Sequence, residues 1–450
     1  MTETQTREKS TRKIALASLI GTTIEWYDLF IYTTAAAVAF NFLFFPEFDP
    51  IVGTLAAFAT YATAYIARPV GAIIFGHIGD RAGRKKTLTI TLTIMGVATF
   101  LIGLLPTYAA IGIAAPILLV TLRFFQGLGL GGEWGGAVLL AVEHAPAHRR
   151  GFFGSWVQMG VPAGVILSNL VWLGIVLLPE EELLAWGWRI PFLLSVVLIF
   201  VGLWIRSKVE ETPTFENVAN EDEKAKIPFF ELVRDYWGQI LLIAGSYFAT
   251  GVVFTVLIAF ALNYATTALA LPRAEVLTAI IIASVLNFFL LPLFGAVSDR
   301  LGRKATYLSG LVGMAILAFP FFWLLNLAQF WSVILGFVLM VIPFSAAYGP
   351  QATLFAEVFR GNIRYSGLSV GYQLGAILGS ALTPLVTTTL FAVTGEVSVV
   401  AWYMIGTCAI SFVCTVVLRS RHWGADALQA PTDLTASVYT QRPRTGRAAR

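Results

Sequence analysis

Charged side chains are scarce in this sequence of 450 residues, because Asp, Glu, Lys and Arg together make up only 12% of it. Soluble domains carry about 25% charged residues. Hydrophobic residues account for 57% of the chain. This balance excludes an ordinary soluble domain and indicates a chain that lies in a lipid bilayer, where the few remaining charges mark the informative positions.

Cysteine and histidine are rarer still, with two and four copies. Cys408 and Cys414 stand six residues apart in one apolar segment, so they point to opposite faces of a helix and are not expected to form a disulfide. The four histidines lack the spacing of metal ligands. We therefore expect neither a disulfide nor a metal site.

Signatures of nucleotide and nucleic-acid binding are also missing. The glycine-rich run 127–132 resembles a phosphate-binding loop, but no strand precedes it and no Walker sequence is present. In an apolar helix, glycines four residues apart such as Gly127 and Gly131 instead favour close helix packing. The net charge of +4 is spread over many short segments. We expect no cofactor and no nucleic-acid partner, and no nucleophile–base arrangement suggests an enzyme.

Long apolar runs dominate what is present. A membrane-spanning helix needs about 20 mostly apolar residues, and no ten-residue alternating pattern indicates strands. The runs that meet or approach the helical length cover residues 14–44, 52–78, 87–105, 111–143, 152–178, 189–206, 237–267, 275–297, 305–325, 330–356, 365–393 and 398–419. The sequence thus predicts an all-α membrane protein with twelve transmembrane helices.

Lys and Arg are distributed asymmetrically around these segments. Basic residues collect on the cytoplasmic side of membrane proteins. With the N-terminus inside, all but four of the 30 basic residues fall on cytoplasmic loops, tails or helix ends. The first apolar run is too long for a cleaved signal peptide. We therefore expect a multi-pass protein of the plasma (inner) membrane whose N- and C-termini are both cytoplasmic.

One long charged stretch, 207–236, divides the expected helices six and six. The predicted parts are a cytoplasmic N-terminal tail (1–13), an N-terminal six-helix half (14–206), a cytoplasmic linker (207–236), a C-terminal six-helix half (237–419) and a cytoplasmic C-terminal tail (420–450). Internal repeats of this kind are common among secondary transporters, which bind substrate between the repeats near the membrane midplane.

The two halves repeat a polar motif at an offset of 219 residues. It consists of Gly76, Asp80, Gly83 and Arg84 in the first half and of Gly295, Asp299, Gly302 and Arg303 in the second. A second echo sets Glu143 and Arg150 against Glu357 and Arg364. Glycine permits a tight turn, and Asp can pair with Arg and with backbone donors at a helix end. We predict a cytoplasmic gate; the alternative role of fixing topology explains the basic residues but not the recurring Gly and Asp.

These repeated loops resemble the signature of the major facilitator superfamily, and residues 123–129 resemble its fourth-span motif. Further motifs are similar to the metabolite:proton symporter family, namely Glu25-Trp26-Tyr27-Asp28, Arg68-Pro69-Val70-Gly71, Gly131-Gly132-Glu133-Trp134-Gly135-Gly136 and Trp186-Gly187-Trp188-Arg189. The resemblance covers nearly the whole chain, from about residue 14 to 419. It implies the major facilitator fold and uptake of an organic acid, such as shikimate, 2-oxoglutarate or citrate, or of an osmolyte such as proline or betaine.

Five ionisable side chains lie deep inside the expected spans. They are Glu25, Asp28, Arg68, Arg123 and Glu133. Ionisable groups at this depth are costly and mark a pathway or a proton relay by default. Their helical spacing places them on polar faces, shared with Tyr32, Tyr65 and Gln126, that would form a polar cavity in the N-terminal half.

Three carboxylates thus meet two guanidiniums, which leaves one acid without a basic partner. We predict proton coupling by Glu133, with Asp28 and Glu25 as the other candidates, because an acid that lacks a partner can load and release a proton. Arg68 and Arg123 suit a substrate carboxylate. Polar residues of the C-terminal half would add hydrogen bonds, among them Asn263, Tyr348, Gln351, Tyr372 and Gln373. The alternative is a buried ion-pair network that only fixes helix packing.

Two other functions stay open at this point. A transporter of the same fold would export drugs or metabolites by proton antiport, and a protein of another class would be a membrane sensor that does not transport. The retained charges at midplane depth argue against the sensor. We expect a proton symporter of a small molecule that works as a monomer.

Overall fold

The computed structural model describes residues 3–47, 50–175, 177–207, 228–359 and 363–418. Every regular element within these ranges is a helix. In the N-terminal half the helices are α1 (Glu3–Ala35), α2 (Asn41–Phe44), α3 (Pro50–Ala82), α4 (Arg84–Leu104), α5 (Tyr108–Ile111), α6 (Ala114–His144), α7 (Arg150–Ile175), α8 (Glu180–Ala185) and α9 (Ile190–Ser207). A π-helical turn, η1 (Ala36–Phe40), joins α1 to α2.

The C-terminal half repeats this plan. Its helices are α11 (Pro228–Thr255), α12 (Ala261–Thr267), α13 (Arg273–Leu301), α14 (Arg303–Asn326), α15 (Phe330–Ala356), α16 (Arg364–Ala376), α17 (Thr383–Thr394) and α18 (Ser398–Val417). Two further π-helical turns lie inside long helices, η4 (Val256–Phe260) between α11 and α12 and η5 (Ile377–Ala381) between α16 and α17.

The prediction of an all-α membrane fold is confirmed. Eleven helical segments of the described chain are long and apolar enough to cross a membrane. The expected span 52–78 falls on α3, a further helix of 33 residues, and with it the count of twelve is met. Two boundaries differ from those expected, because α1 begins at Glu3 and α11 already begins at Pro228. Polar residues at the water-facing ends continue these helices, since helix formation does not require apolar side chains.

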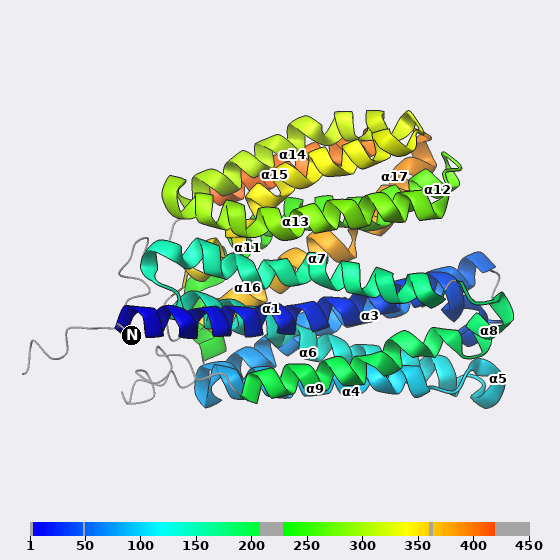
Figure 1. The fold of residues 1–450 in the computed structure, drawn as a ribbon, viewed down its shortest axis with the longest axis horizontal. Coiled ribbons are helices and arrows are strands. Elements are labelled where there is room, and N and C mark those ends of the chain that lie inside the picture. The colour runs from blue at the N-terminus through cyan, green and yellow to red at the C-terminus, as the bar shows by residue number, and fades with distance from the viewer. Residues whose placement is uncertain (1–2, 48–49, 176, 208–227, 360–362, 419–450) are drawn as a thin grey trace, which may run out of the picture.

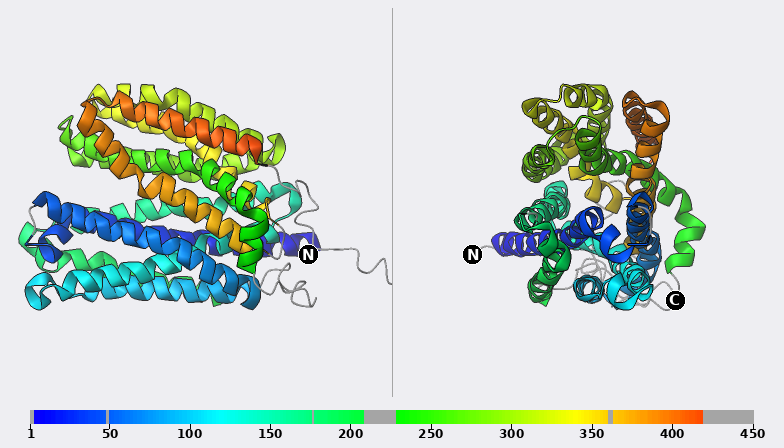
Figure 2. Two further views of the ribbon diagram at one scale, coloured as in Figure 1. Left: turned by 180° about the vertical axis from the view of Figure 1, so that it is seen from behind. Right: turned by 90° about the vertical axis from the view of Figure 1, so that its right-hand side faces the viewer.

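The helices form two bundles that lie side by side. In Figure 1 the helices from α1 to α9 make up the lower bundle, and α12 to α15 lie in the upper one. Figure 2 shows that the bundles approach each other at the end that holds the N-terminus and draw apart toward the opposite end. Contacts between the bundles involve α7 with α13 and α3 with α16.

Glycines bring α3 and α6 into backbone contact within the first bundle. A Cβ atom at Gly131 would lie 2.0 Å from the carbonyl oxygen of Arg68, and one at Gly127 would lie 2.2 Å from that of Ala64. Only glycine fits such an approach. The expected close helix packing is thus present, and it presses the backbone of Arg68 against the middle of α6.

Candidate functional site

The five ionisable residues of the N-terminal half are all buried between helices. Their exposed fractions are 5% for Glu25, 0% for Asp28, 3% for Arg68, 0% for Arg123 and 1% for Glu133. None of them faces the outer surface of the bundle, where lipid would lie. These five residues have three different sets of contacts.

The first set of contacts joins Asp28 to Arg123 through two intermediate side chains. Thr99 of α4 donates a hydrogen bond of 2.8 Å to Asp28 Oδ2, and Gln126 Nε2 donates one of 2.7 Å to the Thr99 hydroxyl. Arg123 Nη1 in turn donates to Gln126 Oε1. The acid on α1 and the guanidinium on α6 therefore belong to one hydrogen-bond network, as their expected facing stripes require.

Tyr32 extends this network toward α3. The Arg123 guanidinium carbon lies 3.7 Å from the centre of the Tyr32 ring, a cation–π contact. The Tyr32 hydroxyl forms a hydrogen bond with Thr60. Asp28 Oδ1 is buried and has no hydrogen-bond partner among the side chains and backbone that the structure describes.

The second set of contacts is that of Glu133, between α6 and α4. Thr91 of α4 donates a hydrogen bond of 2.8 Å to Glu133 Oε2. Thr91 and Thr99 are eight residues apart on one helix, which is about 12 Å along its axis. Glu133 and Asp28 are therefore held at different depths along α4, each through its own threonine.

The third set of contacts is that of Glu25 and Arg68, at the boundary between the two bundles. Arg68 lies over the ring of Tyr65 at 4.1 Å and is close enough to Tyr247 of the second bundle to interact electrostatically. Glu25 interacts electrostatically with both Tyr348 and Tyr372. These two charges thus face the other half of the protein, whereas Arg123 lies inside its own half.

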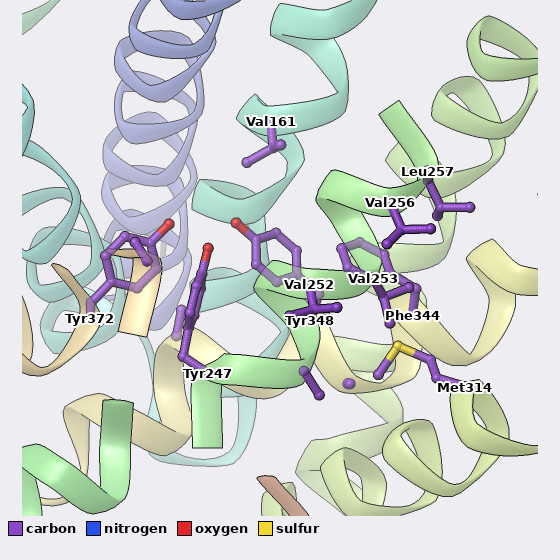
Figure 3. Packing of buried hydrophobic residues seen from close by; sticks show 14 of the residues in the cluster. Val161, Tyr247, Val252, Val253, Val256, Leu257, Met314, Phe344, Tyr348 and Tyr372 are labelled. Carbon is purple, nitrogen blue, oxygen red and sulfur yellow. The ribbon is translucent and has the colours of Figure 1, made fainter. Parts of the chain in front are cut away.

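Three buried tyrosines of the C-terminal half gather opposite these charges. Tyr247, Tyr348 and Tyr372 come from α11, α15 and α16 and are each exposed by 4% or less. Figure 3 shows their hydroxyl oxygens pointing toward one another from the three helices. Side-chain hydrogen bonding links Tyr372 to both of the others.

Contacts at the same depth join this tyrosine cluster to the first bundle. The Trp134 and Tyr372 rings stack with their centres 3.7 Å apart, and Trp134 Nε1 donates a hydrogen bond of 2.8 Å to Gln158 Oε1. Gln158 Nε2 donates to the backbone oxygen of Tyr348 at 3.3 Å. Gln373 Nε2 reaches the backbone oxygens of residues 130 and 131 at 3.4 Å. Among the predicted residues, Tyr348 and Gln373 therefore lie at the boundary between the halves.

Asn263 does not join this group. It is exposed on α12, and its side-chain oxygen accepts a hydrogen bond from Thr267 one turn away. Sequence reasoning in turn missed Tyr247 and the two α4 threonines, since a single Tyr or Thr in an apolar helix carries no periodic signal. The stacking partner of Tyr372, Trp134, appeared only as part of a family motif.

The predicted gate motif forms close contacts between the bundles at the N-terminal end of the molecule. The Asp299 side chain at the end of α13 accepts hydrogen bonds of 2.8 and 2.9 Å from the backbone N–H groups of Gly151 and Phe152. These donors lie in the first turn of α7, whose backbone N–H groups have no partner within the helix and where the helix dipole favours a carboxylate. Arg303 also contacts Asp299 at 3.3 Å.

Two ion pairs accompany this contact. Arg364 Nη1 lies 3.0 Å from Glu143 Oε1, and both side chains are 1% exposed. Arg303 Nε lies 3.2 Å from Glu357 Oε1, in a more exposed position. Burial raises the pKa of Glu357 above its ordinary value, and the nearby guanidiniums of Arg303 and Arg150 partly offset this rise. The pair Arg364–Glu143 joins the halves, whereas Arg303–Glu357 lies within one half.

The glycines of the motif have the conformations that their turns require. Gly83 and Gly302 adopt positive φ values of 101° and 95° between consecutive helices, a region that favours glycine. Gly76 packs against Ser366 of α16, where an added Cβ would lie 3.0 Å from the hydroxyl. The side chains of Asp80 and Arg84 lie outside the described part of the structure.

No group of three or more His, Cys, Asp or Glu residues suited to a metal occurs within the described ranges. The arrangement instead combines buried charges, hydrogen-bonding aromatic side chains and a closed contact at one end of two similar bundles. This combination is that of a protein that moves a polar solute between two helical halves.

Comparison with known proteins assigns the chain to a family. Residues 19–362 and 243–442 match the model of the Major Facilitator Superfamily. The chain is 41% identical to the shikimate transporter of Escherichia coli K12 over 413 residues, which are 91% of this chain and 94% of that protein. It is 33% identical to the proline/betaine transporter of the same organism over 418 residues, 91% of this chain and 83% of the relative.

Solved structures show the same fold. The proton:xylose symporter XylE bound to 6-bromo-6-deoxy-D-glucose superposes with a TM-score of 0.75 at 18% identity, over 91% of this chain and 95% of that chain. The inward-open conformation of XylE from E. coli gives 0.62 at 18% identity, over 93% and 98% of the two chains.

The protein belongs to the Major Facilitator Superfamily. It is a multi-pass membrane transporter, and its relatives are transporters rather than enzymes. The family resemblance of the sequence motifs is confirmed, and two of the carrier types that it implied, for shikimate and for proline and betaine, are among the relatives.

Proposed function

We propose that this protein takes up a small carboxylate-bearing metabolite in symport with protons. The observation that carries this proposal is the position of Arg68 and Glu25, two buried charges of one half that face the tyrosine cluster of the other half. Substrate sites of such two-half carriers lie at this boundary. The relatives named for shikimate and for proline and betaine, all carboxylates, support this substrate class.

Arg68 is the proposed carboxylate-binding group. A guanidinium presents a planar fork of donors that matches a carboxylate. Arg68 lies at the boundary between the halves, whereas Arg123 is held by Gln126 and Tyr32 inside the first half. Of the two arginines that the sequence nominated, the geometry therefore favours Arg68 for the substrate and Arg123 for the proton site.

Asp28 is the proposed proton-coupling acid, in place of Glu133, which the sequence favoured. Asp28 shares a network with Arg123, so movement of the guanidinium changes the electrostatic cost of holding a charge on the acid. Glu133 is held by Thr91 of α4, outside the network of Asp28 and Arg123. Substrate binding at Arg68 of α3 can reach Asp28 through α6, which carries Arg123 and is in backbone contact with α3.

The contacts of Asp299, Glu143 and Arg364 act as the proposed cytoplasmic gate. They hold the halves together at the end where the N-terminus lies, while the bundles draw apart at the other end. Release of these contacts would let the halves rock and expose the site to the cytoplasm. We further propose that both termini are cytoplasmic, that the membrane is the plasma (inner) membrane and that a monomer suffices.

Uptake into proteoliposomes tests this function. The purified protein is reconstituted and offered labelled shikimate, 2-oxoglutarate, citrate, proline and betaine, with the outside acidic and the inside negative. We expect one of these solutes to accumulate above its external concentration, and the accumulation to collapse when a protonophore is added. Equal uptake with and without the gradient would exclude proton coupling, and gradient-driven extrusion would instead support an antiporter.

A further inference from the structure

An aromatic cage binds a cation with open ring faces. In the tyrosine cluster, by contrast, ring faces are covered. Trp134 covers one face of Tyr372 with an interplanar angle of 15°, and Phe344 stacks on Tyr348 at 5.2 Å and 22°. The Tyr247 ring meets Tyr372 edge to face at 4.7 Å. Ring faces are the part of an aromatic residue that attracts a quaternary ammonium group. Here neighbouring rings occupy faces of Tyr348 and Tyr372.

The hydroxyl groups of the cluster remain directed toward a common region. Figure 3 shows the oxygens of Tyr247, Tyr348 and Tyr372 converging from three helices. Each phenol has one donor and two acceptor positions. Tyr372 is linked to both neighbours, and in addition Tyr247 is linked to Ser380 and Tyr348 to Gln158. These four links take up six of the nine positions, so three remain for a ligand.

Buried carboxamides add further hydrogen-bonding capacity beside these hydroxyls. Gln351 is 0% exposed, and neither its Nε2 nor its Oε1 has a partner among the residues that the structure describes. It follows Tyr348 by three residues on α15 and therefore lies on the same side of that helix. Gln373 Oε1, next to Tyr372, also has no described partner. A buried amide without a partner costs free energy that a bound hydroxyl group can recover.

We propose that the tyrosine cluster and Gln351 select a hydroxylated carboxylate as the transported substrate. This inference rests on the proposed function, in which Arg68 binds the carboxylate. The substrate hydroxyls then exchange hydrogen bonds with Tyr247, Tyr348 and Tyr372 and with the carboxamide of Gln351. Fully alkylated zwitterions such as betaine have no hydroxyl donors, so they would leave these buried groups unpaired.

A matched pair of ligands tests the inference directly. Shikimate and cyclohex-1-ene-1-carboxylate share the ring, the double bond and the carboxylate, and they differ only in three hydroxyl groups. Binding is measured by isothermal titration calorimetry on the purified full-length protein, so the result does not depend on proton coupling. We expect shikimate to bind at least about 100-fold more tightly than the deoxygenated acid, and more tightly than betaine.

Single substitutions locate the effect. Tyr348→Phe and Tyr372→Phe retain the stacked rings and remove one hydroxyl each, and Gln351→Leu removes the carboxamide at similar size. Each should weaken shikimate binding by about tenfold and leave binding of the deoxygenated acid unchanged within about twofold. Tyr264→Phe is the matched control, because Tyr264 is also buried but its hydroxyl donates to Asn326. It should alter neither affinity.

The outcomes distinguish failure of this inference from failure of the proposed proton symport. Equal affinities for shikimate and the deoxygenated acid, or tighter binding of betaine, would overturn the selection of hydroxyl groups. Gradient-driven uptake of proline or 2-oxoglutarate without shikimate binding would overturn it as well, yet leave proton symport standing. If no solute of the uptake experiment accumulates, the proposed function itself fails.

Discussion

The two halves of this transporter share one helical plan but carry different chemistry at the same depth. The N-terminal half holds Glu25, Asp28, Arg68, Arg123 and Glu133 in buried positions. The described helices of the C-terminal half offer only neutral groups at their centre, chiefly the three tyrosines and the amides of Asn287, Gln351 and Gln373. Asn287, for instance, accepts a hydrogen bond of 2.9 Å from Ser345.

This difference indicates a division of labour. A charged network can change its protonation and so respond to the proton gradient. Neutral hydroxyls and amides instead form hydrogen bonds to a substrate and do not titrate near neutral pH. Of the two arginines deep in the N-terminal half, Arg68 is the one at the boundary, where it lies over Tyr65 of its own half and interacts electrostatically with Tyr247 of the other half. Four predictions, ordered from the largest expected effect to the smallest, would break or sharpen this comparison.

Neutralising the proposed proton site should have the largest effect. Asp28→Asn keeps the size of the side chain and its capacity to accept from Thr99 but removes the titrating group. We expect gradient-driven accumulation in proteoliposomes to fall to the level without a gradient, while exchange of labelled for unlabelled substrate continues.

Glu133→Gln serves as the comparison for Asp28→Asn in the same uptake assay. It should retain at least part of the accumulation, because Glu133 is held on α4 outside the Asp28–Arg123 network. Loss of accumulation in Glu133→Gln together with full accumulation in Asp28→Asn would return the proton site to Glu133.

Cutting the ion pair that joins the halves should destabilise the protein strongly. Glu143→Gln leaves the guanidinium of Arg364, which is 1% exposed, without its carboxylate. Breaking a buried pair costs about 3–5 kcal/mol. Glu357→Gln, in the more exposed pair within one half, should cost about 1 kcal/mol or less. Thermal unfolding in detergent measures both, and equal losses would contradict the distinction.

Filling the contact between α3 and α6 should have an intermediate effect. Gly131→Ala would place a Cβ atom 2.0 Å from the Arg68 carbonyl oxygen and force the helices apart, at a cost of about 1–3 kcal/mol. Gly406→Ala is the matched control, since nothing lies within 4 Å of the added atom in α18. That change should be neutral or slightly stabilising. Unfolding in detergent and substrate affinity together report the displacement of Arg68.

The smallest expected effect concerns pH. Burial raises the pKa of Glu357 above its ordinary value of 4.5, so the folded protein holds this proton more tightly than the unfolded chain. The resulting stabilisation is fully present below pH 4.5 and is lost as pH rises through the raised pKa. Relative to Glu357→Gln, the free energy of unfolding of the native protein should fall across that window. A parallel pH dependence in both proteins would contradict the shift.

Much of the architecture was accessible from sequence, because lipid imposes simple rules on it. Apolar length located the helices, and the 219-residue echo located the motif whose Asp299 contacts α7. Burial of the five charges followed from their cost in lipid. The rule does not say which neighbours each buried charge has, so the separate hydrogen bonds of Glu133 and Asp28 to two threonines of α4 were not predicted.

The site of the second half was harder to predict for a physical reason. Neutral tyrosines and glutamines are cheap enough in a membrane protein to serve as packing contacts, so their presence alone does not indicate a site. Only the packing of α11, α15 and α16 brings Tyr247 beside Tyr348 and Tyr372. Trp134 of α6 and Phe344 of α15 then cover faces of the Tyr372 and Tyr348 rings. Asn263 shows the converse, since a polar residue in an apolar run was placed at the site but lies exposed on α12.

The π-helical turns carry a consequence for how such a molecule bends. Residues 36–40 and 256–260 adopt the wider turn in corresponding helices of the two halves, 220 positions apart. A wider turn holds one surplus residue, which advances the phase of every later side chain and loosens the ladder of backbone bonds at that level. The first helix of each half can therefore bend at this turn, with the segment before it and the segment after it moving relative to each other.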